Sequence, residues 1–458
     1  MAAGRRSAAR LLNGTRAGRA VVAAAAVCVG VGGFDLGAVN VVLPRLASAF
    51  QVTPAAVQWV SIAYLLPIAA LALPTGRWLD TVGRRPAMLL LVAGFTVCSV
   101  VAALAPAFGA LIAARVAQGA FGAGLFAICP ALAYESVRPE RRMRTVAIVS
   151  TLGAVGGIAG PPIGALVTEL AGWPWIFLVS VAVLGATMVV FALALPVGAP
   201  LTAPGVAFLS ESLLLGGAAA AVLLALTFST RDARWLLLAI AAVPLGAAWR
   251  RSHPDSPVLT LGRRAGFRRS ATALALLAAS TLSVQYLLAF LAQRALGLSA
   301  TVTGAALLFV SVAAVAGSLT AARLTARMRQ AHVSAAGFAL FAAGVLASLT
   351  VGRSAAAVLL GLVAIVLGLG QGLANTPATA IGLSYSTPDT MGSTGAAISF
   401  LRNVGFTAGP AIVTVIWAAG DYTESGLRLA LAGVAVAAAA GSAIVLRSAP
   451  VQPATATG

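Results

Sequence analysis

The string Gly76-Arg77-Trp78-Leu79-Asp80-Thr81-Val82-Gly83-Arg84-Arg85 joins two apolar segments and is the most specific pattern in the chain. Its glycines permit a tight turn between adjacent helices, and its arginines can hold a charged membrane surface. Asp80 can cap a helix start or pair with an arginine. A loop that served only to keep positive charge in the cytoplasm would need the arginines, but not Asp80 and two glycines at these spacings. The string therefore predicts a short, structured loop between two membrane-spanning helices.

The rest of the chain has the composition of a membrane protein. Of its 458 residues, 60% are hydrophobic and 9% are charged, whereas about a quarter of the residues in soluble domains are charged. All 30 basic residues are arginine, which with the abundant alanine and glycine indicates GC-rich bacterial coding and not a surface for nucleic acid. Cys28, Cys98 and Cys129 lie in separate apolar runs without the spacing of a metal site. We expect neither a nucleic-acid partner nor a metal.

Apolar runs long enough to span a membrane, about 20 residues each, recur along the chain. A secretory signal peptide is an alternative for the first run, because five arginines precede it. That run continues past Asp35 to Pro44 without a small-residue cleavage site, which favours a retained helix. The pattern predicts about fourteen helices, at 20–43, 57–75, 86–105, 109–134, 143–168, 175–196, 207–228, 234–249, 271–293, 302–322, 333–351, 355–376, 391–417 and 427–446.

The arginines also predict the orientation, because cytoplasmic loops are enriched in basic residues. The amino-terminal arm and the loops on its side of the membrane hold 22 arginines, and the opposite loops hold six. We therefore expect a multi-pass protein of the bacterial cytoplasmic membrane with both termini in the cytoplasm. This orientation requires an even number of spans, and twelve helices would satisfy it as well as fourteen.

A weak internal repeat divides the predicted helices into two halves. Gln118-Gly119 recurs as Gln371-Gly372, and Gly160-Pro161 recurs as Gly409-Pro410 at nearly the same offset. Such repeats are typical of transporters built from two parallel bundles. We expect an all-α membrane protein with two six-helix bundles and two extra linker helices. Its expected parts are a basic cytoplasmic arm (1–19), a first bundle (20–196), two inserted linker helices (197–250), a cytoplasmic loop (251–270), a second bundle (271–446) and a disordered tail (447–458).

Asp35 and Arg115 are ionisable residues inside predicted spans. An ionised side chain at this depth costs about 3 kcal/mol even on lenient insertion scales. Burial favours the neutral form of a carboxyl group, which suits a reversible proton carrier. Counted from the outer ends of their helices, the two residues lie at nearly the same depth. We expect an Asp35–Arg115 pair that couples transport to protons, and a permanent structural pair is the alternative.

Glycines recur every four residues in the fifth predicted helix. Gly156, Gly160 and Gly164 share one face, beside Pro161-Pro162. Such a face permits close helix approach, and the prolines bend the span. The pattern predicts a helix contact that transport requires, with generic small-residue packing as the alternative.

These patterns together resemble those of the major facilitator superfamily, specifically its fourteen-helix drug:proton antiporter branch. The resemblance implies alternating access, a cytoplasmic gating loop, and proton-driven multidrug efflux of the kind that gives antibiotic resistance. The matching residues are Asp35, Asn40, Val41, Leu43 and Pro44 in the first helix, Gln58, Trp59, Tyr64 and Leu65 in the second, Gly76, Asp80, Gly83, Arg84 and Arg85 in the gating loop, Arg115, Gln118 and Gly119 in the fourth helix, and Gly156, Gly160, Pro161 and Gly164 in the antiporter motif.

Polar and aromatic residues inside the spans indicate a substrate path, because polar groups are rare at this depth. They suit a large apolar cavity with few hydrogen-bonding groups, which would bind small amphiphilic compounds. Arg402, eleven residues into its predicted helix, is expected near mid-depth. The candidate residues are Phe34, Tyr64, Gln118, Gln285, Tyr286, Gln293, Gln371, Asn375 and Arg402.

Other classes of function fit the sequence less well. His253 and His332 are the only histidines and lie in or beside loops, without an arguable Ser/His/Asp arrangement. The chain has neither a phosphate-binding Gly-x-x-x-x-Gly-Lys-Ser/Thr loop nor the carbonyl-filter string of an ion channel. We expect that the protein is not an enzyme and has no cofactor. We expect a monomer in the lipid bilayer that uses the proton gradient as its energy source. Proton-coupled uptake of a small organic solute by the same fold is the alternative, because one membrane acid serves either direction.

Overall fold

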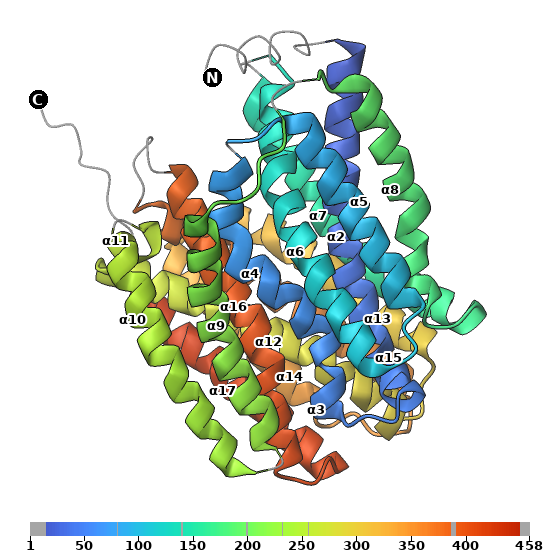
Figure 1. Ribbon diagram of the computed structural model, residues 1–458. Coiled ribbons are helices and arrows are strands. Elements are labelled where there is room, and N and C mark those ends of the chain that lie inside the picture. The colour runs from blue at the N-terminus through green and yellow to red at the C-terminus, as the bar shows by residue number, and fades with distance from the viewer. Residues whose placement is uncertain are drawn as a thin grey trace, which may run out of the picture. The chain divides into compact units, whose positions relative to one another are not determined.

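The computed structural model describes residues 15–79, 81–138, 141–197, 200–230, 232–254, 256–385 and 391–448. Within these ranges the chain consists of helices and short connections (Figure 1). This confirms the predicted all-α fold. Asp80, residues 1–14 of the basic arm and residues 449–458 of the predicted tail lie outside the described residues.

The helices form two compact units, divided between Gly217 and Ala218 within α9. In the first unit α2 packs against α6, α7 and α8, while α4 and α5 pack against α6. Its helices are α2 (Arg16–Ala49), α3 (Pro54–Val57), α4 (Trp59–Leu79), α5 (Arg84–Ala103), α6 (Phe108–Glu135), α7 (Arg142–Leu170), α8 (Trp175–Ala194) and the first half of α9 (Val206–Ser229).

The second unit has a similar set of neighbours. Here α12 packs against α15, α16 and α17, while α13 and α14 pack against α15. Its helices after α9 are the 3-10 helix η2 (Ala233–Ala241), α10 (Ala242–Ser252), α11 (Pro257–Gly262), α12 (Ala265–Phe290), the π-helical turn η3 (Leu291–Ala295), α13 (Ala300–Leu324), α14 (Gln330–Ser348), α15 (Ala356–Leu383), α16 (Met391–Ala418) and α17 (Glu424–Leu446).

Thirteen helices in the described ranges are long and apolar enough to cross a membrane. The 29-residue α7 adds a shorter apolar stretch, Val155–Leu170. The expectation of about fourteen spans agrees with this count. Prolines inside the helices, such as Pro44 in α2 and Pro130 in α6, are tolerated because neighbouring helices can satisfy the freed backbone groups.

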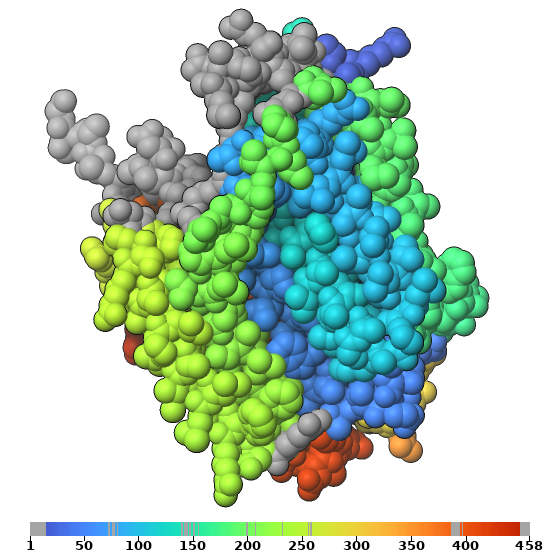
Figure 2. Space-filling view, viewed as in Figure 1, coloured from blue at the N-terminus to red at the C-terminus, as the bar shows by residue number. Residues whose placement is uncertain are grey.

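The segment expected as a span at 234–249 differs in kind from the other helices. It begins as η2, where the Asp232 side chain accepts a hydrogen bond from the Arg234 backbone, and continues as α10. No residue of η2 is buried, and Figure 2 shows the segment in yellow-green on the surface. Because few protein neighbours constrain it, its apolar side chains are left to face lipid.

The segment expected as a cytoplasmic loop at 251–270 is partly helical. It contains α11, and α12 begins at Ala265, six residues before the predicted start of the ninth span. Arg263 and Arg264 lie between α11 and α12, whereas Arg251 lies in α10 and Arg268 and Arg269 lie in α12. Long basic side chains can reach the membrane surface from a helix end.

Candidate functional site

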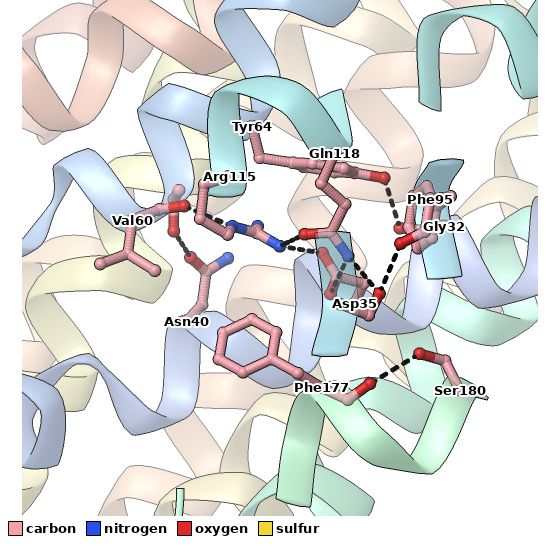
Figure 3. Close-up of polar contacts among 12 residues, drawn as sticks. Gly32, Asp35, Asn40, Val60, Tyr64, Phe95, Arg115, Gln118, Phe177 and Ser180 are labelled. Carbon is pink, nitrogen blue, oxygen red and sulfur yellow. Dashed lines mark hydrogen bonds and ion pairs between the residues drawn. The ribbon is translucent and has the colours of Figure 1, made fainter. Parts of the chain in front are cut away.

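The centre of the first unit holds a buried ion pair between α2 and α6. Asp35 is 2% exposed and Arg115 is fully buried. Arg115 Nη1 donates to Asp35 Oδ2 at 2.5 Å and to Gln118 Oε1 at 2.7 Å, and its Nε donates to the Val60 carbonyl at 2.8 Å (Figure 3). The structure therefore brings together the two residues that depth counting suggested as a pair. It also places Gln118 in this network.

Side chains from three more helices complete the network. Gln118 Nε2 donates to Ser99 Oγ on α5 at 2.9 Å and lies 3.5 Å from Asp35 Oδ1. The Arg115 guanidinium lies 4.4 Å from the ring centre of Tyr64 on α4 and 5.6 Å from that of Phe177 on α8. A cation between aromatic faces gains electrostatic stabilisation that water would otherwise supply. Ser99 and Phe177 were not predicted, because the sequence does not show which faces of α5 and α8 point inward.

A second polar contact lies further along α2. Ser61 Oγ on α4 donates to Asn40 Oδ1 at 2.9 Å, and both residues are buried. Asn40 is five residues from Asp35, so the two contacts follow the same helix (Figure 3). The Asp35 contact thus joins α2 to α6, and the Asn40 contact joins α2 to α4.

The charge of Asp35 is compensated by Arg115. The ionised carboxylate is stabilised by the arginine and the amide, and adding a proton removes half of the ion pair. Arg115 Nη2 is buried and has no hydrogen-bond partner in the described part of the chain. The arginine therefore has one donor group available at the site whichever form Asp35 takes.

The aromatic face above Arg115 gives a first prediction. Tyr64→Phe should leave transport within about twofold of the unmodified protein, because the ring remains and the 3.5 Å contact of the hydroxyl with the Gly32 carbonyl is long. Tyr64→Leu should lower the rate at least about tenfold, because loss of a desolvated cation–π contact is worth about 2 kcal/mol. Initial transport rates at equal expression measure both. Equal rates for the two variants would contradict a role for the ring.

The glycine face of α7 lies against α2 next to Asp35. A Cβ atom at Gly160 would lie 2.6 Å from the Phe34 carbonyl oxygen and 2.9 Å from Gly37 Cα, and one at Gly164 would lie 2.7 Å from Ala38 Cβ. A Cβ at Gly156 would collide with the Gly30 carbonyl oxygen. The motif glycines thus let two backbones touch over the stretch of α2 that carries the carboxyl group. Pro161 Cδ lies in the same contact, 2.9 Å from the Cβ position of Gly37.

The loop string between α4 and α5 is described except for Asp80. Gly76 lies in the last turns of α4, and Gly83 is the residue before α5. Arg84 forms a two-point ion pair with Glu135 at the end of α6, at 2.7 Å and 3.2 Å, and donates to the Leu79 carbonyl at 2.9 Å. Arg85 is half-buried at the start of α5. The loop therefore joins three helix ends, and its acidic partner Glu135 was not predicted.

The remaining substrate-path candidates are divided between the two units. Phe34 on α2 is half-buried. Tyr286 is 1% exposed and packs at steep ring angles against Phe290 and Trp417, at ring-centre distances of 5.1 Å and 6.4 Å, so it belongs to the core of the second unit. The half-buried amides are Gln285 on α12, Gln293 in the π-helical turn, and Gln371 and Asn375 on α15.

Arg402 is the twelfth of the 28 residues of α16. The backbones of α12 and α16 touch where Gly405 faces Ala275 and where Gly409 faces Ala279, so the two helices run in the same direction with a constant offset. This register places Arg402 level with residue 272 of α12, about 6 Å along the axis from the level of Arg268. Its expected place near mid-depth stays a prediction.

The major facilitator superfamily model matches residues 25–410. The chain belongs to this superfamily. It is therefore a membrane transporter with a multi-pass fold, in a family whose members are generally not enzymes. The match covers both units and includes every residue of the buried network.

Relatives and solved structures agree with this placement. Over 150 residues the chain is 33% identical to MdtD proteins from Cronobacter sakazakii and Escherichia fergusonii, which are provisionally named multidrug resistance proteins. The match covers 32% of this chain and 32% of each relative. Two inward-facing crystal structures of a bacterial homologue of the human lysosomal transporter Spinster, one unoccupied and one occupied, have TM-scores of 0.67 at 15% and 16% identity. They cover 95% of this chain and 98% and 97% of theirs, and at this identity they show the fold alone.

Proposed function

We propose that this transporter exports amphiphilic drugs across the bacterial cytoplasmic membrane in exchange for protons. The observation that carries the proposal is the buried Asp35–Arg115–Gln118 network. A buried ion pair at this depth is costly to desolvate, and apolar packing of the same volume is often as stable, so stability alone gives little reason for the pair. Similarity to MdtD over a third of the chain supports a drug as the substrate.

The proposed coupling uses two forms of the first unit. With Asp35 ionised, its carboxylate holds Arg115 Nη1, and the unit binds substrate. Protonation of Asp35 breaks the ion pair and changes the packing of α2 against α6 and α7. A ligand that binds the two forms with different affinity then shifts the equilibrium between them, which is what alternating access requires.

The close contact of α7 with α2 supports coupling through this helix pair, because α2 carries Asp35. The antiporter motif that forms the contact favours export. We further propose that both termini lie in the cytoplasm, and that the protein acts as a monomer without a cofactor. The arginine asymmetry of the loops supports this orientation.

Everted membrane vesicles test the direction of transport, because their cytoplasmic face is outside. An exporter should accumulate a fluorescent amphiphile when the vesicle interior is acidic, and a protonophore should abolish accumulation. A proton-coupled uptake transporter would instead drain a preloaded amphiphile from the acidic interior. That result would replace export with the uptake alternative.

A further inference from the structure

Arg402 on α16 contrasts with Arg115 in having no partner among the described residues. Arg115 is held by a carboxylate, an amide, a backbone carbonyl and two aromatic rings. Across the described ranges, the guanidinium of Arg402 has no hydrogen bond, ion pair or ring contact, and its Nε is buried without an acceptor. The five N–H donors of an arginine inside a membrane helix normally bind protein acceptors or a ligand. Arg402 is therefore a candidate ligand-binding group.

No described carboxylate of the second unit neutralises Arg402. Asp232 is exposed at the start of η2, and Glu424 is paired with Arg428 at 2.7 Å. Asp421 follows the end of α16, nineteen residues from Arg402, which corresponds to about 28 Å along a helix. The charge on Arg402 is thus uncompensated within the described part of this unit.

The end of the second unit nearest Arg402 is positively charged. Arg268 and Arg269 are exposed one turn from its level on α12, and Arg264 precedes that helix. Arg269 donates to the Arg447 carbonyl at 2.7 Å, so the end of α17 lies beside the start of α12. Charges of one sign at the entrance of a low-dielectric region raise the local concentration of the opposite ion. This end of the unit therefore favours anions.

We propose that Arg402 binds the acidic group of the transported amphiphile, a carboxylate, sulfonate or phosphate. This deepens the proposed function and rests on it, by naming anionic amphiphiles and not lipophilic cations as the preferred substrates. The planar guanidinium can donate two parallel hydrogen bonds to such a group, whereas it repels a cation. The headgroup of an anionic phospholipid has the same chemistry, so the experiment must separate a substrate from a lipid.

The test is equilibrium binding to the purified protein in phosphatidylcholine nanodiscs without a proton gradient. The probes are anilinonaphthalene sulfonate as the anion and ethidium as the cation. Binding of each probe is measured as quenching of tryptophan fluorescence, after subtraction of the signal from empty nanodiscs. Arg402→Gln should raise the Kd for the sulfonate at least about tenfold and leave the Kd for ethidium unchanged or lower. Arg402→Lys should give an intermediate Kd, because it keeps the charge but loses the planar fork.

A matched control is Arg323→Gln at the exposed end of α13, which should leave both Kd values unchanged. The proposal is wrong if Arg402→Gln raises the Kd of both probes equally, if it leaves the Kd of the sulfonate unchanged, or if the unmodified protein does not bind the sulfonate. It is also wrong if the variant retains sulfonate binding but purifies with less phosphatidylglycerol, since Arg402 would then hold a lipid. If Arg402→Gln selectively loses sulfonate binding while the unmodified protein shows no proton-driven export in everted vesicles, the proposed function is wrong and the anion site is still supported.

Discussion

Asp35→Asn is expected to reduce proton-driven transport to the level of vesicles that lack the protein. Asparagine keeps an oxygen that can accept the hydrogen bond from Arg115, but it cannot gain or lose a proton. The variant also leaves the fully buried Arg115 without its counter-charge, and removing one partner of a buried ion pair costs about 3–5 kcal/mol. Everted vesicles should therefore show a large loss of transport, and thermal unfolding in detergent should show a large loss of stability.

Two further variants separate loss of coupling from loss of folding. Asp35→Glu keeps a titratable carboxyl group and should retain part of the transport. The double variant Asp35→Asn with Arg115→Gln removes both charges, so it should recover much of the thermal stability while transport stays at background. Proton-driven transport by the double variant would contradict the coupling role of the pair.

Gly160→Leu is expected to nearly abolish export. The neighbours of its new side chain are backbone atoms of α2, the Phe34 carbonyl oxygen at 2.6 Å and the Ala38 nitrogen at 2.8 Å, which cannot move aside as a flexible side chain can. Overpacking typically costs about 1–3 kcal/mol, and we expect a value near the upper limit here. Because this stretch of α2 also carries Asp35, its displacement should disturb the Arg115 contact.

Gly185→Leu on α8 is the matched control, because a Cβ atom at Gly185 meets nothing within 4 Å. It should insert, unfold and transport as the unmodified protein does. Export at the normal rate by Gly160→Leu, with Gly185→Leu also normal, would show that the α2–α7 contact is ordinary packing.

The sequence was sufficient to predict features that depend on one helix at a time. Span positions follow from hydropathy, and the Asp35–Arg115 pair follows from depth counting along two helices. The glycine face of α7 is also visible in the sequence, but its partner is not. The structure places that face against α2 within the first unit.

Features that depend on the rotation or register of several helices could not be predicted. Ser99 and Phe177 look like ordinary residues of apolar helices until α5 and α8 are seen to turn them toward Gln118 and Arg115. The level of Arg402 relative to Arg268 likewise depends on the register of α16 with α12, which the sequence does not show.

The central claim, that Asp35 exchanges a proton against substrate, is tested most directly by proton release on binding. The purified protein in lightly buffered detergent solution near neutral pH receives a saturating amount of the amphiphile that everted vesicles transport fastest, and the pH change is recorded. The account predicts that the unmodified protein releases protons as substrate binds, and that Asp35→Asn binds the same amphiphile without releasing any. Equal proton release by the two proteins would contradict it.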